Sequence, residues 1–452
     1  MTRKGIFCDG IRRRDFVRVG SAGLLGTTWT LPHLLQQQAL AFEQGVDRSK
    51  EDRSKEDRSL IVVFLRGGLS TIDTWDMKPN APAEIRGDFN PISTNVAGIQ
   101  IGEHTPRVAQ QVDKFSLIRS FTHRNSDHGP ADHYMLTGYH PVAGFNASVT
   151  PNNQRPSHGS VIARKLGPRG SVPPYVCVPD MHPSGGASYL GANYAPFSMN
   201  ADPNDPGFAV RDIVPPLDLD PTRVDSRREL LSQVDRYQKN AEVRANTIAK
   251  KVSVFQQKAF DLMTSSKAKQ AFDIHGEDDR LRDEYGRNSL GQSCLMARRI
   301  VEAGVRYVSI HHVDWDTHDN NFVTLKRDLL PHLDAAMSTL FRDLSDRGML
   351  DQTIVLIMSE FGRTPRINQN GGRDHWGPGF SLAIGGGGIP GGQVIGSSDE
   401  RAERPAENPY GPEDLAQTLY FSMGINTKEE FITAEGRPMP IANGGQLIKE
   451  LL

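Results

Sequence analysis

The feature that most constrains this chain is a series of short apolar runs separated by helical segments. Short runs rich in Val, Ile, Leu and Phe are typical of strands that are buried on both faces of a parallel sheet. We predict such strands at residues 60–65, 115–121, 175–179, 306–311, 353–358 and 380–384. Apolar residues recur at helical spacing over 325–344, which predicts an amphipathic helix between two of these strands. The alternation predicts an α/β fold, with a mainly parallel sheet covered by helices on both faces.

The other helices and one long loop region complete the predicted domain, residues 60–452. A short helix is expected over 130–138, where Gly138 would end it. Residues 226–304 are predicted to be mostly helical, and 412–423 to form a final helix. Residues 142–225 are rich in Pro, Gly and Asn and predict a loop-rich insertion, a type of region that often shapes a binding site.

The N-terminus predicts a targeting segment. Residues 12–18 contain the pattern R-R-x-F-x-R, an uncharged apolar run follows at 19–26, and Ala39 and Ala41 supply small residues two apart. This order predicts a twin-Arg signal peptide over 1–41, cleaved near Ala41, that directs the chain to the periplasm or outside the cell through the twin-Arg export machinery. The apolar run is too short and too glycine-rich to span a bilayer, so no transmembrane anchor is expected after cleavage. The alternative is a basic amphipathic first helix.

Charge patterning indicates a tether and excludes some partners. Residues 48–59 repeat a five-residue charged unit, so we expect a disordered, charged tether over 42–59. The net charge of −2 offers no field that would attract nucleic acid or anionic lipid. Outside the signal peptide only Cys177 and Cys294 remain; a disulfide between them and a pair of buried thiols are both compatible with the sequence.

Polar clusters follow several predicted strands, at residues 66–76, 123–133, 311–319 and 360–375. Ligands bind beyond the carboxyl ends of the strands in such sheets, so these clusters predict one shared site. In the third cluster Asp314 and His318 are four residues apart, and a turn could direct both at one divalent ion, zinc in particular, with manganese or calcium as alternatives. A polar loop with hydrogen-bonded histidines is the competing interpretation, and a surface turn is the alternative for the pair Asp374 and His375.

Taken together, these motifs resemble those of the alkaline phosphatase/sulfatase superfamily, and more narrowly those of an uncharacterised family of twin-Arg-exported, sulfatase-related bacterial proteins. The resemblance covers roughly residues 60 to 450. Asp314 and His318 match the Asp-x-x-x-His pair of the superfamily phosphatases, and His375 matches the later histidine that binds the same metal. Residues 359–362 stand where sulfatases carry Ser-Asp-His-Gly, so the resemblance implies that Glu360 is a further ligand.

The chain departs from the family pattern at catalytic positions. Phe361 stands in place of a ligating histidine. At the end of the first strand Asp73 or Asp76 would have to substitute for the family's aspartate, so a second metal site is not implied. His128 occupies the sulfatase nucleophile position, two residues before a proline, and Asp132 replaces the supporting arginine. No cysteine is available there for conversion to formylglycine.

The leading hypothesis is a metal-dependent hydrolase of anionic phosphate or sulfate esters. His128 or Ser126 would attack the ester, or a water bound to the metal would do so, and Arg66 and Arg363 would hold the anionic group. The first alternative is a non-catalytic relative of the sulfatases that binds a ligand or a protein partner. The second alternative is a metal enzyme with non-hydrolytic chemistry, such as phosphoryl transfer or isomerisation.

Overall fold

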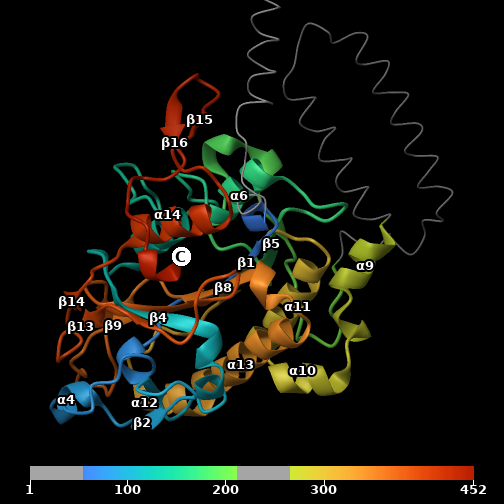
Figure 1. The fold of residues 1–452 in the computed structure, drawn as a ribbon. Helices are drawn as coiled ribbons and strands as arrows, with labels where there is room; N and C mark the ends of the chain where they lie inside the picture. Colours follow the sequence, from blue (N-terminus) through green and yellow to red (C-terminus); the bar gives the residue numbers. More distant parts are fainter. Residues whose placement is uncertain (1–53, 211–264) are drawn as a thin grey trace, which may run out of the picture. The chain divides into compact units, whose positions relative to one another are not determined.

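A computed structural model of the chain describes residues 54–210 and 265–452; the predicted signal peptide lies outside these residues. The central element is an eight-stranded sheet with the order β12-β4-β11-β8-β1-β7-β5-β6. Figure 1 labels β4, β8, β1 and β5 of this sheet. Its strands are β1 (Ser59–Leu65), β4 (Phe115–Phe121), β5 (Tyr175–Val178), β6 (Phe197–Ser198), β7 (Tyr307–His312), β8 (Thr353–Met358), β11 (Phe380–Gly385) and β12 (Val394–Ile395). All six predicted strands are present, and their ends differ from the prediction by at most one residue.

The strand directions place several loops at one edge of the sheet. β1 pairs in parallel with β7 and β8, and β5 pairs in parallel with β7. β11 is antiparallel to both β8 and β4, so β4 runs in the same direction as β8. The prediction of a mainly parallel sheet is therefore confirmed, with β11 as a reversed strand. The carboxyl ends of β1, β4, β5, β7 and β8 meet at the edge where β11 begins.

Helices cover both faces of the sheet, as predicted. Successive side chains of a strand point to opposite faces, and the two sets in β1 belong to two separate hydrophobic clusters. Ile61 and Val63 pack in a cluster with residues of α11 (Ser289–Glu302) and α13 (Leu330–Asp346). Leu60, Val62 and Phe64 pack in a cluster with residues of α5 (His128–Thr137), α6 (His158–Leu166) and α14 (Pro412–Ser422). Figure 1 shows α6 and α14 on one side of β1 and β8, and α11 and α13 on the other.

Two predicted helices show how local sequence sets their ends. α5 ends at Gly138, whose φ of 74° is left-handed and whose amide donates to the carbonyl of Tyr134, as expected for a glycine that ends a helix. The amphipathic helix predicted over 325–344 begins with a π-helical turn, Leu325–Leu329, before α13. Pro331 lies in the first turn of α13, and its lack of an N–H group excludes a regular helical hydrogen bond at this point. The helix is therefore wound as a π-helix over Leu325–Leu329 and as an α-helix from Leu330.

Smaller elements surround this core. Two-stranded sheets pair β2 (Pro91–Ser93) with β3 (Gln100–Gly102), β9 (Gly362–Arg363) with β10 (His375–Trp376), β13 (Ser397–Ser398) with β14 (Pro405–Glu407), and β15 (Glu430–Ile432) with β16 (Pro438–Pro440). Short helices are α4 (Ala83–Arg86), α9 (Ser266–Phe272), α10 (Asp279–Tyr285) and α12 (Asn321–Thr324). β9 and β10 matter for the site, because they place His375 directly opposite Arg363.

Several predicted regions differ in detail. The region 142–225 contains α6, which begins where the Ser157 hydroxyl accepts from the Ser160 amide, and also β5 and β6; residues 211–225 lie outside the described residues. So do residues 226–264 of the predicted helical region and 42–53 of the predicted tether, whose last residue, Ser59, already belongs to β1. Cys177 and Cys294 are both buried and free. Among the described helices, none is long and apolar enough to cross a membrane.

Candidate metal centre

A group of histidine and aspartate side chains lies at the carboxyl edge of the sheet. His128 begins α5, after β4; Asp316 follows β7; and His375 lies in β10, just before β11. One ligand atom from each of these three residues lies within 4.8 Å of those from the other two. The topology of the sheet brings together residues that are up to 247 positions apart, from 128 to 375.

His318 lies outside the set whose atoms are all within 4.8 Å of one another, but it contacts two of its members. Its Nε2 atom lies 3.1 Å from Asp316 Oδ1 and 3.0 Å from His375 Nε2. His375 Nε2 itself lies 3.0 Å from Asp316 Oδ1, and His128 Nε2 lies 3.2 Å from Asp316 Oδ2. Zinc bonds of 2.0–2.2 Å place tetrahedral ligands about 3.4 Å apart, so these separations are close to those of a coordination shell.

The protons of the three histidines are fixed by acceptors behind them. The Nδ1–H of His128 donates to Glu360 Oε1 at 2.7 Å, that of His318 donates to Asp374 Oδ1 at 2.7 Å, and that of His375 donates to the Ser126 carbonyl at 3.0 Å. Carboxylate and carbonyl oxygens can only accept, so each neutral ring keeps its Nε2 lone pair free. Three nitrogen lone pairs therefore face the carboxylate of Asp316. A histidine backed by a carboxylate or carbonyl in this way is the usual arrangement of a metal ligand.

Burial and neighbouring charges shift the pKa values of the group in opposite directions. Burial disfavours protonation of His128, but Glu360 and Asp316 outweigh burial and raise its pKa. Burial would raise the pKa of Asp316, but the hydrogen bond and charge of Arg363 outweigh it and hold the pKa well below its usual range. Burial lowers the pKa of His375. A proton on His128 and a divalent cation are thus alternative ways to neutralise the same acceptors.

In the structure, Asp316 and not the predicted Asp314 lies beside the histidines. Asp314 is exposed, has a φ of 79°, and does not belong to the group of three ligand atoms. Trp315 is buried between the two aspartates and donates to His312 Nδ1 at 3.0 Å. The spacing Asp-x-x-x-His therefore selected the wrong carboxylate, because the loop turns at residue 314 and directs the next aspartate toward the histidines.

Glu360 occupies a different role from the predicted one. Its Oε1 atom accepts from His128 and also from the Gly67 amide at 2.8 Å, and the residue is fully buried. These bonds place Glu360 behind His128, as the group that orients the imidazole, and not in contact with the ion that the histidines would share. Burial and the neighbouring Asp132 raise the pKa of Glu360, and the interaction with His128 opposes this shift.

Arg363 does not have the free guanidinium that its predicted substrate-binding role requires. Its side chain is fully buried, and all three nitrogens donate to protein acceptors. Nε donates to the Gly68 carbonyl at 3.0 Å and Nη1 donates to the Arg373 carbonyl at 3.0 Å. Nη2 donates to the Gly67 and Trp315 carbonyls and to Asp316. Arg363 is therefore a positioning residue, which fixes the Gly67–Gly68 turn and the carboxylate of Asp316.

Arg66 and Ser126 remain available for interaction. The Arg66 side chain is 36% exposed, and its Nε donates to Asp132 Oδ2 at 3.3 Å, while no acceptor is assigned to its terminal nitrogens within the described part of the chain. Ser126 is exposed; its carbonyl orients His375, and its Oγ accepts from the Gly377 amide at 3.1 Å. Both residues flank the histidine group.

Asp73 and Asp76, which would have to supply the missing aspartate of the first strand, are engaged elsewhere. Asp73 forms a buried, two-pronged ion pair with Arg373, with both contacts at 2.8 Å. Asp76 lies 3.0 Å from Lys78 Nζ and also contacts Arg119. Both carboxylates are thus paired with cationic side chains outside the histidine group.

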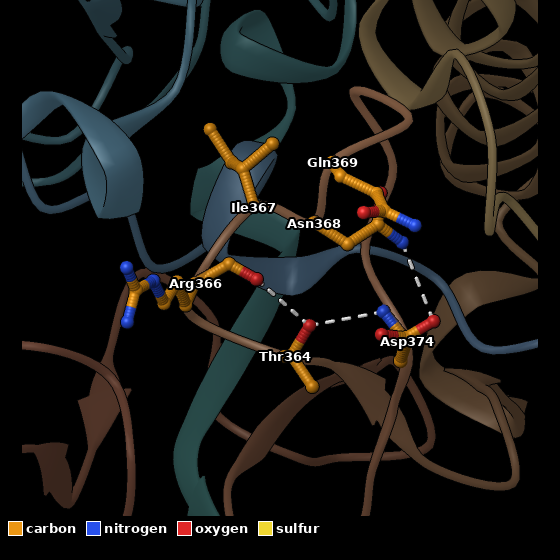
Figure 2. Close-up of a pocket in the computed structure, with 6 residues that line it drawn as sticks. All are labelled: Thr364, Arg366, Ile367, Asn368, Gln369 and Asp374. Atoms are coloured by element: carbon orange, nitrogen blue, oxygen red, sulfur yellow. Dashed lines mark hydrogen bonds between the residues drawn. The ribbon is translucent and has the colours of Figure 1, made fainter.

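A pocket of about 540 Å³ adjoins the group on the side of His318, because Asp374 lines the pocket and accepts from His318. Figure 2 shows its lining, in which the Thr364 hydroxyl links the Arg366 carbonyl and the Asp374 amide, and the Asn368 side chain donates to Asp374. Asp374 thus connects the pocket to His318. Asp316 was not among the predicted ligands, and Asp374 was predicted only as the neighbour of His375, although both lie inside predicted clusters.

The fold and the site together define an α/β protein whose structural neighbours include sulfatases and members of the alkaline phosphatase superfamily. The phosphonate monoester hydrolase SpPMH from Silicibacter pomeroyi has 12% identity and a TM-score of 0.38, over 87% of this chain and 76% of that chain. The PsFucS1 sulfatase from Pseudoalteromonas sp. has 13% identity and a TM-score of 0.35, over 87% and 70%. A protein in the alkaline phosphatase superfamily from Vibrio parahaemolyticus has 10% identity and a TM-score of 0.38, over 81% and 66%.

Residues 57–452 match the family described as "Protein of unknown function (DUF1501)", and the chain belongs to this family. No curated protein matches the sequence.

Proposed function

We propose that this protein is an exported, metal-dependent hydrolase of phosphate or sulfate esters. The observation that carries the proposal is the set of three histidine Nε2 lone pairs that face Asp316, each fixed by an acceptor on the opposite ring nitrogen. Imidazole and carboxylate ligands together suit zinc, and they also accept manganese. Export through the twin-Arg route and a periplasmic or secreted location belong to the same proposal and rest on residues 1–41 alone.

The chain's own residues have separate roles in this proposal. His128, Asp316, His318 and His375 hold the divalent ion, and Glu360 and Asp374 orient two of the imidazoles. Such an ion, when bound, supplies Lewis-acid polarisation of an ester oxygen and a more acidic water. Arg66 binds the anionic group of the ester through its terminal nitrogens, because guanidinium matches the oxygens of phosphate and sulfate. His128 acts as a ligand here and not as the nucleophile, which leaves Ser126 or water to attack.

The proposal is tested by metal content and ester hydrolysis in one set of proteins. Protein purified without chelator is analysed for bound metal, and chelated protein is assayed with phosphate and sulfate monoesters before and after metal is restored. We expect a tightly bound transition metal in the wild-type protein, and at least a tenfold loss of affinity in His318→Ala, since second-shell changes alone cost about that much. His140→Ala is the control, because His140 is exposed and lies outside the ligand group.

Two results would contradict the proposal in different ways. Equal metal affinity in His318→Ala and in the control would rule out the proposed set of metal ligands. Normal metal binding without hydrolysis of any ester would instead favour the non-catalytic alternative. If hydrolysis is found, Ser126→Ala separates attack by the serine hydroxyl, which this variant abolishes, from attack by water, which it leaves.

A further inference from the structure

A buried carboxylate lies beside Arg66, the residue proposed above to hold the anionic group of the ester. The Asp132 side chain is 3% exposed, and its Oδ2 atom accepts from Arg66 Nε at 3.3 Å. His182 Nε2 lies 3.3 Å from the same oxygen. Because His182 Nδ1 accepts from the Ser184 amide at 3.0 Å, the ring has its one proton on Nε2 and is neutral. Arg66 is therefore the cation that offsets the charge of Asp132.

Arg66 flanks the proposed metal ligands on two sides. It follows β1, and the next residue, Gly67, packs against the backbone of Asp316 so closely that a Cβ atom at Gly67 would not fit. The Arg66 side chain reaches Asp132, which is one turn after His128 on α5. No acceptor is assigned to the terminal nitrogens of Arg66 in the part of the chain that the structure describes. The guanidinium thus has its Nε bound to Asp132 and its terminal nitrogens free for a ligand.

The second arginine in contact with this group, Arg363, is also offset by a carboxylate. Its Nη2 atom donates to Asp316, and its side chain is fully buried. Arg124 and Asp127, in the loop before α5, have opposite charges and are both exposed, so solvent and salt screen their fields. The two arginine–aspartate pairs bring as many carboxylates as guanidinium groups to the metal centre. The positive charge of the centre would therefore come mainly from the bound ion.

We propose that Asp132 is a specificity-determining residue, which favours esters with one negative charge over esters with two. This inference rests on the proposed hydrolase function and narrows its substrate class to singly charged groups, such as sulfate monoesters. A phosphate monoester carries a charge of about −1.5 to −2 at pH 7, whereas a sulfate monoester carries a single negative charge. Arg66 supplies hydrogen bonds to either group, but the carboxylate bound to it opposes each added negative charge. The penalty is therefore larger for the doubly charged ester.

Two non-hydrolysable ligands of similar shape test this preference. Benzenesulfonate carries one negative charge and phenylphosphonate carries two in alkaline buffer, and neither contains an ester bond. Isothermal titration calorimetry measures the dissociation constant of each ligand on full-length protein loaded with zinc. The measured quantity is the ratio of the two dissociation constants, and its change between proteins does not depend on how zinc alone ranks the ligands.

Asp132→Asn removes the charge but keeps an oxygen that can accept from Arg66 Nε. We expect the affinity for phenylphosphonate to rise by roughly fivefold or more relative to that for benzenesulfonate, because a unit charge acts strongly at close range in a site of reduced dielectric constant. Asp132→Ser is a second variant without the charge, and it should shift the ratio in the same direction. Asp127→Asn is the matched control, because it removes an exposed carboxylate at the start of the same helix and should leave the ratio unchanged. Zinc content and the thermal unfolding midpoint verify that each variant is loaded and folded.

The outcomes separate this inference from the hydrolase proposal. An unchanged ratio in Asp132→Asn and Asp132→Ser overturns the inference, and so does an equal loss of affinity for both ligands, which would instead assign Asp132 to the orientation of Arg66. If the wild-type protein hydrolyses esters while the ratio does not change in the variants, this inference fails and the hydrolase proposal stands. If the ratio changes as expected while no ester is hydrolysed, the hydrolase proposal fails and the charge preference of the site stands.

Discussion

The replacement of Asp374 by alanine tests the orientation of His318 by a carboxylate behind it. Asp374 Oδ1 accepts the Nδ1–H of His318 at 2.7 Å, and this bond also lowers the pKa of Asp374. Loss of such a partner typically weakens metal binding 10- to 100-fold, or about 1.4–2.7 kcal/mol. The Asp374 side chain is 55% exposed, so water can replace part of the lost bond. We therefore expect Asp374→Ala to weaken metal binding by roughly tenfold, near the lower limit of this range.

Competition with a chromophoric chelator measures this difference directly. Asp319→Ala is the matched control, because Asp319 is adjacent to His318 in sequence, is exposed, and bonds Asn370 instead of a histidine. Both variants remove an exposed carboxylate, so their stabilities should differ little from that of the wild-type protein. If Asp374→Ala and Asp319→Ala bind metal with equal affinity, the inference that acceptors behind the rings define the ligand atoms is refuted.

The remaining predictions concern stability. Arg363→Lys should lower the free energy of unfolding by about 3–5 kcal/mol, since lysine cannot reproduce the buried contacts to Gly67, Gly68 and Asp316. Unfolding in urea measures this change. A decrease below about 1 kcal/mol would contradict the positioning role. Burial lowers the pKa of His158 to about 4, so this residue binds fewer protons in the folded state than in the unfolded state. Above about pH 6.5 the neutral His158 leaves the free energy of unfolding at its full value. As the pH falls toward 4, the free energy of unfolding decreases, by roughly 3 kcal/mol at most. Urea unfolding at a series of pH values, with chelator present, measures how the free energy of unfolding depends on pH. His158→Gln should weaken this pH dependence. An unchanged pH dependence in the variant would exclude His158 as its source.

Much of the fold follows from local sequence. The runs at 60–65 and 354–358 are apolar at every position because both faces of β1 and β8 are covered, and this continuous pattern distinguishes them from strands with an exposed face. The sequence also placed the polar clusters at one edge, since the loops after parallel strands share an edge regardless of side-chain detail. His318 was identified in this way and His375 through its match to the family motif, and the structure brings their Nε2 atoms to 3.0 Å.

The sequence by itself determined the layered architecture and the loops that carry the chemistry, because both depend on hydrophobic periodicity and chain direction. Only the tertiary structure decided which side chains face one another. Asp316 joins the histidines and Asp314 does not, because the backbone turns at residue 314 and Trp315 is buried between them. Arg363 became internal because carbonyl groups from two distant loops surround it. Residue types and spacing do not record the direction of a side chain in a loop, which depends on packing and on competition for hydrogen bonds.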